Sequence, residues 1–366
     1  MKKVIRWAVA VSALAAAVML VTGGPAGAAS TASTGSSAPV AARAAAAGAL
    51  GNYRISGDED AIGCLTAHRC VAVGYGGGKA PGQVVTVVAG KQVRVAVART
   101  ASNLVAVSCP NRFGCWAIGP PRTGRRSWVL VKIGPTGSIA EVTSVRLPVG
   151  VTLTSISCTS RTACEVLGIT SEAATGWDNW YLAAWNGSKL SHRTVVGTGE
   201  YLAQPGGVSC WQATCVAVGA WYCPGSACYE WTYGIMTTNG GKLEKAAFLS
   251  TAGTFSGVSC VSASTCYATT SNGIVTLDDG TVTATESEAV SGSIECDGTT
   301  CWDAGMANGA AAFVMITNGA PTGTPVPDPA LTAASFPSIA RRGSGFAAVG
   351  EAAVDGGPRV SEVVTN

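Results

Sequence analysis

Short runs in which apolar and polar residues alternate dominate the chain after its first fifty positions. Two examples are "SWVLVKIG" at 127–134 and "GIVTLDDGTVTATE" at 273–286, and Gly, Pro, Asn and Ser bound most of the runs. An alternation with a period of two places every second side chain on the same face of a β-strand. Patterns with the period of a helix are scarce. The chain is therefore predicted to form many short antiparallel strands in an all-β fold.

One of these patterns recurs along the chain with two cysteines inside it. "VSCPNRFGCWAIG" at 107–119 returns as "ISCTSRTACEVLG" at 156–168 and as "VSCWQATCVAVG" at 208–219. A copy without cysteine, "PSIARRGSGFAAVG", stands at 337–350. Units of about forty to fifty residues with four strands each are typical of β-propeller blades. We predict a seven-bladed β-propeller of four-stranded antiparallel blades, with a six-bladed ring or an open array as the alternative.

The two ends of the chain are expected to complete one blade together. The last unit has room for three strands before Asn366, and "LGNYRISGDED" at 50–60 would supply its outer strand. The expected propeller domain is therefore 49–366, with an N-terminal strand that closes the last blade.

The first 28 residues have the pattern of a cleaved signal peptide. Lys2, Lys3 and Arg6 precede a short apolar run, and Ala26-Gly27-Ala28 fits the cleavage rule. That run is short for a membrane span, so the mature protein is expected to be secreted, extracellular and without a membrane span. Residues 29–48 consist mostly of Ala, Ser, Thr and Gly, and they are interpreted as a flexible leader.

The fourteen cysteines fall into seven close pairs that are expected to be disulfides. Facing cysteines on neighbouring strands lie within bonding reach, and an exported protein meets oxidising conditions. Zinc would need a second ligand pair, and the chain has two histidines, so we expect no metal and no cofactor. The predicted disulfides are Cys64–Cys70, Cys109–Cys115, Cys158–Cys164, Cys210–Cys215, Cys223–Cys228, Cys260–Cys266 and Cys296–Cys301.

The charge of the mature chain argues against nucleic acid as a partner. Loss of the signal peptide removes three basic residues and leaves 21 basic and 21 acidic side chains. A broad basic field, which nucleic-acid binding normally requires, is therefore absent from the composition.

The repeats resemble those of a group of secreted actinobacterial β-propeller proteins. Those proteins carry S-C-x(4-5)-C-x-A-V-G units, each followed by a W-(D/N)-G hairpin, and "AAWNGSKL" at 183–190 matches that hairpin. The resemblance covers roughly residues 60–350 and implies the propeller fold and export. It implies little about activity, because most such proteins have no assigned function.

Aromatic and arginine residues concentrate in the expected loops of blades two to four, on the face opposite the cysteine turns. Exposed aromatic rings stack on sugars or anchor protein partners, and Arg supports either role. The same tryptophans would alternatively pack inside the blades. We predict a monomeric, non-catalytic binding propeller that recognises a glycan or an extracellular protein through Arg125, Arg126, Trp177, Trp180, Trp221, Tyr222 and Trp231.

The alternative function is an extracellular polysaccharide hydrolase or lyase. Its candidate acids near the aromatic loops are Glu172, Asp178, Glu200 and Glu230, and hydrolysis by paired carboxylates requires a set distance between two of them. The acidic run Asp58–Asp60 would either bind Ca²⁺ or form a solvated turn.

Overall fold

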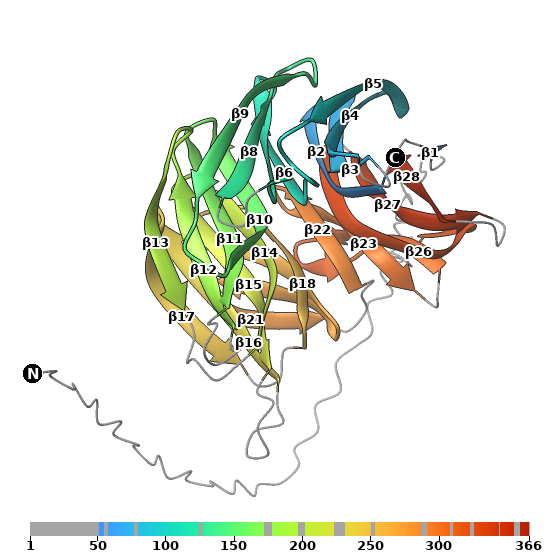
Figure 1. Cartoon of the computed structure of the whole chain (residues 1–366). Helices are drawn as coiled ribbons and strands as arrows, with labels where there is room; N and C mark the ends of the chain where they lie inside the picture. Colours follow the sequence, from blue (N-terminus) through green and yellow to red (C-terminus); the bar gives the residue numbers. More distant parts are fainter. Residues whose placement is uncertain are drawn as a thin grey trace, which may run out of the picture. The chain divides into compact units, whose positions relative to one another are not determined.

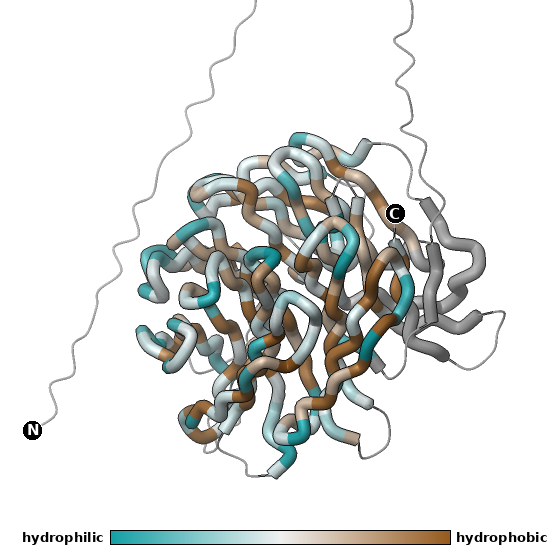
Figure 2. Tube along the Cα trace, turned by 90° about the horizontal axis from the view of Figure 1, so that it is seen from above, coloured by the Kyte–Doolittle hydropathy of each residue, from teal (hydrophilic) through white to brown (hydrophobic). Residues whose placement is uncertain are grey.

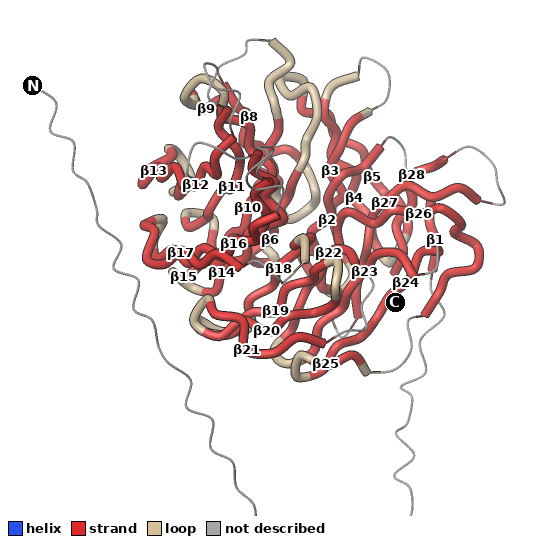
Figure 3. Tube along the Cα trace, turned by 90° about the horizontal axis from the view of Figure 1, so that it is seen from below, coloured by secondary structure: helices blue, strands red, loops and turns tan. Residues whose placement is uncertain are grey.

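The structure is a computed structural model in which the described residues are strands and their connecting turns, without a helix (Figure 3). All of them belong to one compact unit, Ala44–Asn366. Within them no helix is long and apolar enough to cross a membrane. The described residues are 51–54, 58–76, 80–123, 127–171, 178–196, 202–222, 231–249, 253–286, 291–307, 310–322, 326–343, 345–354 and 359–365.

Blades one to five are separate antiparallel sheets, each built from four consecutive strands (Figure 1). Blade one contains β2 (Asp58–Thr66), β3 (Arg69–Tyr75), β4 (Gly82–Val88) and β5 (Lys91–Ala98). Blade two contains β6 (Ala106–Asn111), β7 (Gly114–Gly119), β8 (Ser127–Ile133) and β9 (Ile139–Arg146). Blade three contains β10 (Val151–Ser160), β11 (Ala163–Ser171), β12 (Asp178–Trp185) and β13 (Leu190–Val196).

The next two sheets repeat this order. Blade four contains β14 (Leu202–Trp211), β15 (Thr214–Tyr222), β16 (Trp231–Asn239) and β17 (Lys242–Leu249). Blade five contains β18 (Phe255–Cys260), β19 (Thr265–Thr270), β20 (Gly273–Asp278) and β21 (Thr281–Glu286).

Blades six and seven share one sheet because the long strand β26 (Val326–Arg342) serves both. Its first part pairs with β24 of blade six, and its later part pairs with β27 of blade seven. The other strands of blade six are β22 (Ser291–Asp297), β23 (Thr300–Ala307), β24 (Ala310–Thr317) and the short β25 (Ala320–Pro321). Blade seven continues with β27 (Gly345–Val354) and β28 (Arg359–Thr365).

The strand β1 (Gly51–Arg54) lies at the outer edge of the last blade. It pairs antiparallel with β28, with Gly51 opposite Thr365 and Arg54 opposite Glu362. Strands from the two ends of the described chain therefore meet in one sheet.

The first strands of the blades form a closed ring. They contact one another in the order β2, β6, β10, β14, β18, β22 and β26, and β26 contacts β2 in turn. This order confirms the seven-bladed propeller predicted from the repeats. The first strands line the centre, and in blades one to five the fourth strand is mostly exposed.

The hydrophobic core is divided among the interfaces between blades. Among the described residues, buried apolar side chains form seven clusters, one for each pair of neighbouring blades. Both faces of an inner strand are apolar because successive side chains point to opposite neighbours. In β11, for example, Val166 packs toward blade two and Leu167 toward blade four. Figure 2 shows hydrophobic residues along the strands and hydrophilic residues at the turns.

Six of the seven predicted disulfides are present, and each closes the first hairpin of its blade. In five of them the two cysteines are direct partners on the first and second strands. The seventh predicted pair, Cys223 and Cys228, lies outside the described residues. The bonds are Cys64–Cys70, Cys109–Cys115, Cys158–Cys164, Cys210–Cys215, Cys260–Cys266 and Cys296–Cys301.

Deletion of the chain through Gly57 should lower the melting temperature by several degrees and promote aggregation. The deletion removes β1 and leaves the edge of β28 without a partner, and such an edge pairs with other chains. A chain that begins at Ala49 keeps β1 and serves as the control. Thermal melting and light scattering of both proteins test the role of β1, and identical behaviour of the two would contradict it.

Candidate functional site

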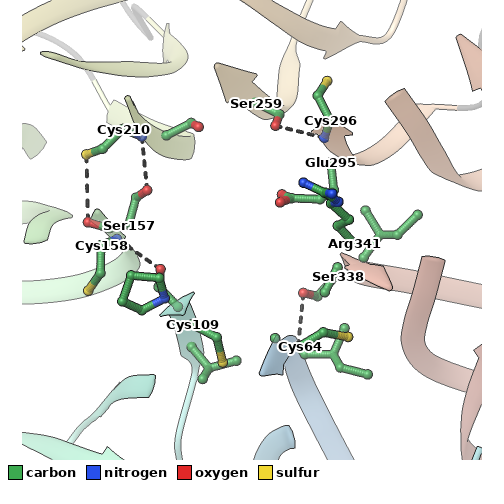
Figure 4. A pocket seen from close by; sticks show the side chains of 18 of the residues that line it. Cys64, Cys109, Ser157, Cys158, Cys210, Ser259, Glu295, Cys296, Ser338 and Arg341 are labelled. Carbon is green, nitrogen blue, oxygen red and sulfur yellow. Dashed lines mark hydrogen bonds between the residues drawn. The ribbon is translucent and has the colours of Figure 1, made fainter. Parts of the chain in front are cut away.

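A cavity of about 640 Å³ opens where the first strands of all seven blades end. It lies on the side of the cysteine hairpin turns, since Ala67 of blade one, Asn111 of blade two and Gly343 of blade seven belong to its wall. This is the opposite side from the loops that the sequence analysis favoured. Figure 4 shows cysteine and serine residues of several blades around this space.

Serine hydroxyls connect neighbouring blades around the cavity. The backbone N–H of Cys158 donates to Ser108 Oγ at 2.9 Å, and that of Cys210 donates to Ser157 Oγ at 3.0 Å. Three further bonds link blades four to five, five to six and seven to one. They are Cys260 N–H to Ser209 Oγ, Cys296 N–H to Ser259 Oγ and Ile62 N–H to Ser338 Oγ.

These hydrogen bonds use only part of the capacity of each hydroxyl. A serine hydroxyl accepts through its lone pairs and also carries one hydrogen that it can donate. Each serine in the ring accepts a backbone N–H and keeps its own hydrogen for another partner. The wall of the cavity therefore presents a series of hydroxyl donors to whatever occupies it.

The repeat changes at three neighbouring blades. Blade one has Gly63 at the serine position, where an added Cβ would lie 2.7 Å from Cys109 Sγ. Blade six has Glu295 there, directly before Cys296. In blade seven Arg341 pairs with Phe346, at the positions that the two cysteines occupy in the other blades.

The two charged exceptions meet at the cavity. Glu295 and Arg341 both line it, and the side chain of Glu295 points into it beside Arg341 (Figure 4). Burial raises the pKa of the Glu295 carboxyl to about 7, and the positive charge of Arg341 offsets part of this rise. The guanidinium of Arg341 forms an ion pair with Asp297 at 2.6 Å, and its Nε donates to the carbonyl of Gly343.

An exposed indole stands at the rim of the same cavity. Trp211 ends β14 and lines the cavity, with 41% of the residue exposed. Such a ring offers an apolar face at the edge of a polar wall. A second exposed aromatic residue on this side, Phe113, is covered by the guanidinium groups of Arg112 and Arg161, at 5.0 and 5.7 Å from its centre.

Two tryptophans predicted to bind ligand are part of the core. Trp180 is fully buried and Trp221 is 2% exposed, and their rings stack with centroids 4.1 Å apart. They lie in the cluster between blades three and four. The expectation that these indoles stand on an exposed surface is wrong, because both faces of the strands that carry them are covered by neighbouring blades.

The other predicted binding residues are not placed as side chains. Tyr222 and Trp231 pair with each other at the ends of β15 and β16, and their side chains are not described. Trp177, Arg125 and Arg126 lie outside the described residues.

Of the four candidate acids of the enzymatic alternative, Asp178 is the one within the described residues. Asp178, in β12, accepts a short hydrogen bond from Ser171 Oγ. Glu172, Glu200 and Glu230 lie outside the described residues.

The acidic run at the start of β2 is tied to amide side chains. Gln83 Nε2 donates to Glu59 at 2.6 Å, and Asn103 Nδ2 donates to Asp60 at 2.7 Å. The side chain of Asp58 is not described. Among the described residues, no group of three or more His, Cys, Asp and Glu side chains is arranged to hold a metal ion.

A buried carboxyl group lies beside a second cavity, of about 560 Å³, between blades three and four. Glu165 is 1% exposed, and burial raises the pKa of its carboxyl to about 7, while the Thr238 hydroxyl offsets part of this rise. Asp303 in blade six is fully buried, and burial raises the pKa of its carboxyl well above the ordinary value.

No known protein family matches the chain, and no curated protein is found to be similar to it. Solved propellers resemble its fold. The WD40 β-propeller domain of Doa1 is 10% identical with a TM-score of 0.57, over 87% of this chain and 97% of that one. The β-propeller domain of the Trilobed protease from Pyrococcus furiosus is 9% identical with a TM-score of 0.53, over 86% and 91%. YCF48 bound to D1 peptide is 14% identical with a TM-score of 0.51, over 87% and 95%. These similarities show the fold.

Replacement of Ser157 by Ala should lower the free energy of unfolding by about 1 kcal/mol, because the N–H of Cys210 loses its acceptor. The fall should stay at this level because the cavity is open to solvent. Ser144→Ala, on the exposed outer strand β9, is the matched control and should leave stability unchanged. Denaturant unfolding of the two variants makes the comparison, and equal stabilities would show that this bond contributes nothing.

The buried carboxyl groups should make stability depend on pH. Glu165 holds its proton up to about pH 7 when folded and loses it near the ordinary value of 4.5 when unfolded. The folded state therefore binds more protons within this window, and the free energy of unfolding falls as the pH rises through it. The contribution of Glu165 is at most about 3 kcal/mol.

Glu165→Gln should make the free energy of unfolding fall less steeply between about pH 4.5 and pH 7. Melting curves measured across this pH range test the expectation. Glu141→Gln, at an exposed ion pair with Lys132, is the control and should keep the wild-type slope. Parallel curves for wild type and Glu165→Gln would contradict the assignment.

Proposed function

We propose that the protein is an exported binding propeller that recognises a saccharide at the channel cavity, on the side of the cysteine hairpins. The observation that carries this proposal is the serine ring with Trp211 at its rim. Hydroxyl groups that both donate and accept match the hydroxyl groups of a sugar, and an indole packs against the apolar face of a pyranose ring.

The composition of the cavity favours binding over cleavage. Among the described residues that line it, Glu295 is the single carboxylate. Glycoside hydrolysis by paired acids needs a second carboxyl group across the scissile bond. The remaining wall consists of the Arg341 guanidinium and of hydroxyl, amide, disulfide, backbone and apolar groups, none of which supplies a second acid.

Export is supported by the disulfides and by the sequence of the first 28 residues. Six disulfides in short hairpins are typical of proteins that fold in an oxidising compartment. Polysaccharides outside the cell are accordingly the proposed source of the ligand.

A second proposed binding surface stays on the opposite side, where the sequence places Trp177, Tyr222, Trp231, Arg125 and Arg126. A protein partner would use such aromatic and arginine residues as anchors. The experiment below distinguishes the two surfaces.

Trp211→Ala should weaken saccharide binding at least about tenfold, since aromatic anchors carry much of the energy of an interface. The experiment screens the mature protein on a glycan array and then measures affinity for the best ligand. Phe248→Ala is the matched control, because Phe248 is also an exposed aromatic residue but lies on the outer strand β17 of the same blade. Unchanged affinity of Trp211→Ala together with a loss in Trp177→Ala would move the site to the opposite side.

A further inference from the structure

The cavity has two chemically different arcs. Along blades two to five its wall carries the neutral hydroxyls of Ser108, Ser157, Ser209 and Ser259. Along blades six and seven it carries the two charged side chains Glu295 and Arg341. These are the charged groups among the described residues of the wall, so the charge of the cavity wall is located in this second arc.

The guanidinium of Arg341 forms its ion pair with Asp297 and not with Glu295. Arg341 binds Asp297 at 2.6 Å and the carbonyl of Gly343 at 3.3 Å, and Asp297 is not part of the cavity wall. Arg341 and Asp297 are exposed residues, with about half of each side chain open to solvent, whereas Glu295 is partly buried and points inward. Among the described ion pairs none includes Glu295.

The three side chains together carry a net negative charge. Two carboxylates and one guanidinium leave one charge uncompensated when both acids are ionised, and the inward position belongs to Glu295. A half-buried carboxylate is stabilised by a cation that can hydrogen-bond to it. The space beside Glu295 therefore favours a ligand that brings a positive charge into the cavity.

We infer that the channel site selects saccharides that carry a free amino group, with the ammonium bound by the Glu295 carboxylate and the sugar hydroxyls by the serine arc. This inference rests on the proposed function and names the ligand class of the same site. An acetylated amine has no charge and one N–H, so it satisfies the carboxylate less well.

The raised pKa of Glu295 agrees with this arrangement. With Arg341 as its nearest cation, the carboxyl still titrates near pH 7, so that Arg341 does not fully compensate it. An ammonium group beside the carboxylate would lower this pKa and draw the group into its ionised form.

The test compares two probes of equal length, a tetramer of glucosamine and its fully N-acetylated form. Calorimetry is done at about pH 7, near the pKa of Glu295, where a bound ammonium group can hold the carboxylate ionised. The wild-type protein should bind the free amine at least about tenfold more tightly. Glu295→Gln should abolish this preference, because a neutral amide cannot pair with the ammonium group. Melting temperatures verify that each variant is folded.

Two further variants separate the local pair from general attraction to acidic surfaces. Asp297→Asn releases Arg341 to pair with Glu295, so the preference should fall although Asp297 is not part of the cavity wall. Glu141→Gln removes an exposed acid of blade two and should keep the full preference.

The outcomes distinguish this inference from the proposed function. Equal binding of both tetramers by the wild type, or a preference that survives Glu295→Gln, overturns the inference and leaves saccharide binding in place. Absence of binding to both tetramers and to every array glycan overturns the proposed function and the inference together.

Discussion

In blades one to six the first strand has one edge without a neighbouring strand, and its backbone N–H groups still need acceptors. In five of the seven blades one serine hydroxyl supplies an acceptor to the next blade, at distances of 2.9 to 3.1 Å. The residue that donates is usually the first cysteine of a hairpin. That cysteine is therefore held twice, by a hydrogen bond to the preceding blade and by a disulfide within its own. At these junctions the pair of restraints helps to fix the position of one blade relative to the next.

The exceptions to this rule are grouped rather than scattered. Gly63, Glu295 and Arg341 belong to blades one, six and seven, which are neighbours where the ring closes. One side of the cavity is consequently uniform and neutral, and the other carries charge. A ligand in this space meets different chemistry along its length, and the site has a direction although the repeat that builds it is nearly symmetric.

Much of the fold was predictable because its cause is periodic. The spacing of the cysteines gave the blades and six observed disulfides, since both depend on contacts within a few residues of one hairpin. The site was harder to predict from the sequence than the fold. Alternation places Trp180 and Trp221 on a strand face, but in a propeller both faces of a strand are covered, so exposure does not follow from aromatic character. Glu295 was visible as a break in the Ser-Cys repeat. Its meeting with Arg341 depends on ring closure and on the pairing of β26 with β27, which no local pattern encodes.

The pairing of β1 with β28 has a mechanical consequence. Gly51 lies opposite Thr365, so force applied to the two ends of the chain acts at the same end of the strand pair. The backbone hydrogen bonds of this pair would then break one after another instead of sharing the load. The ring would open at this seam while the hairpins closed by disulfides stayed intact. The pulling force therefore acts first on the pairing of the four-residue strand β1 with β28, and a protein tethered by both ends would open there first.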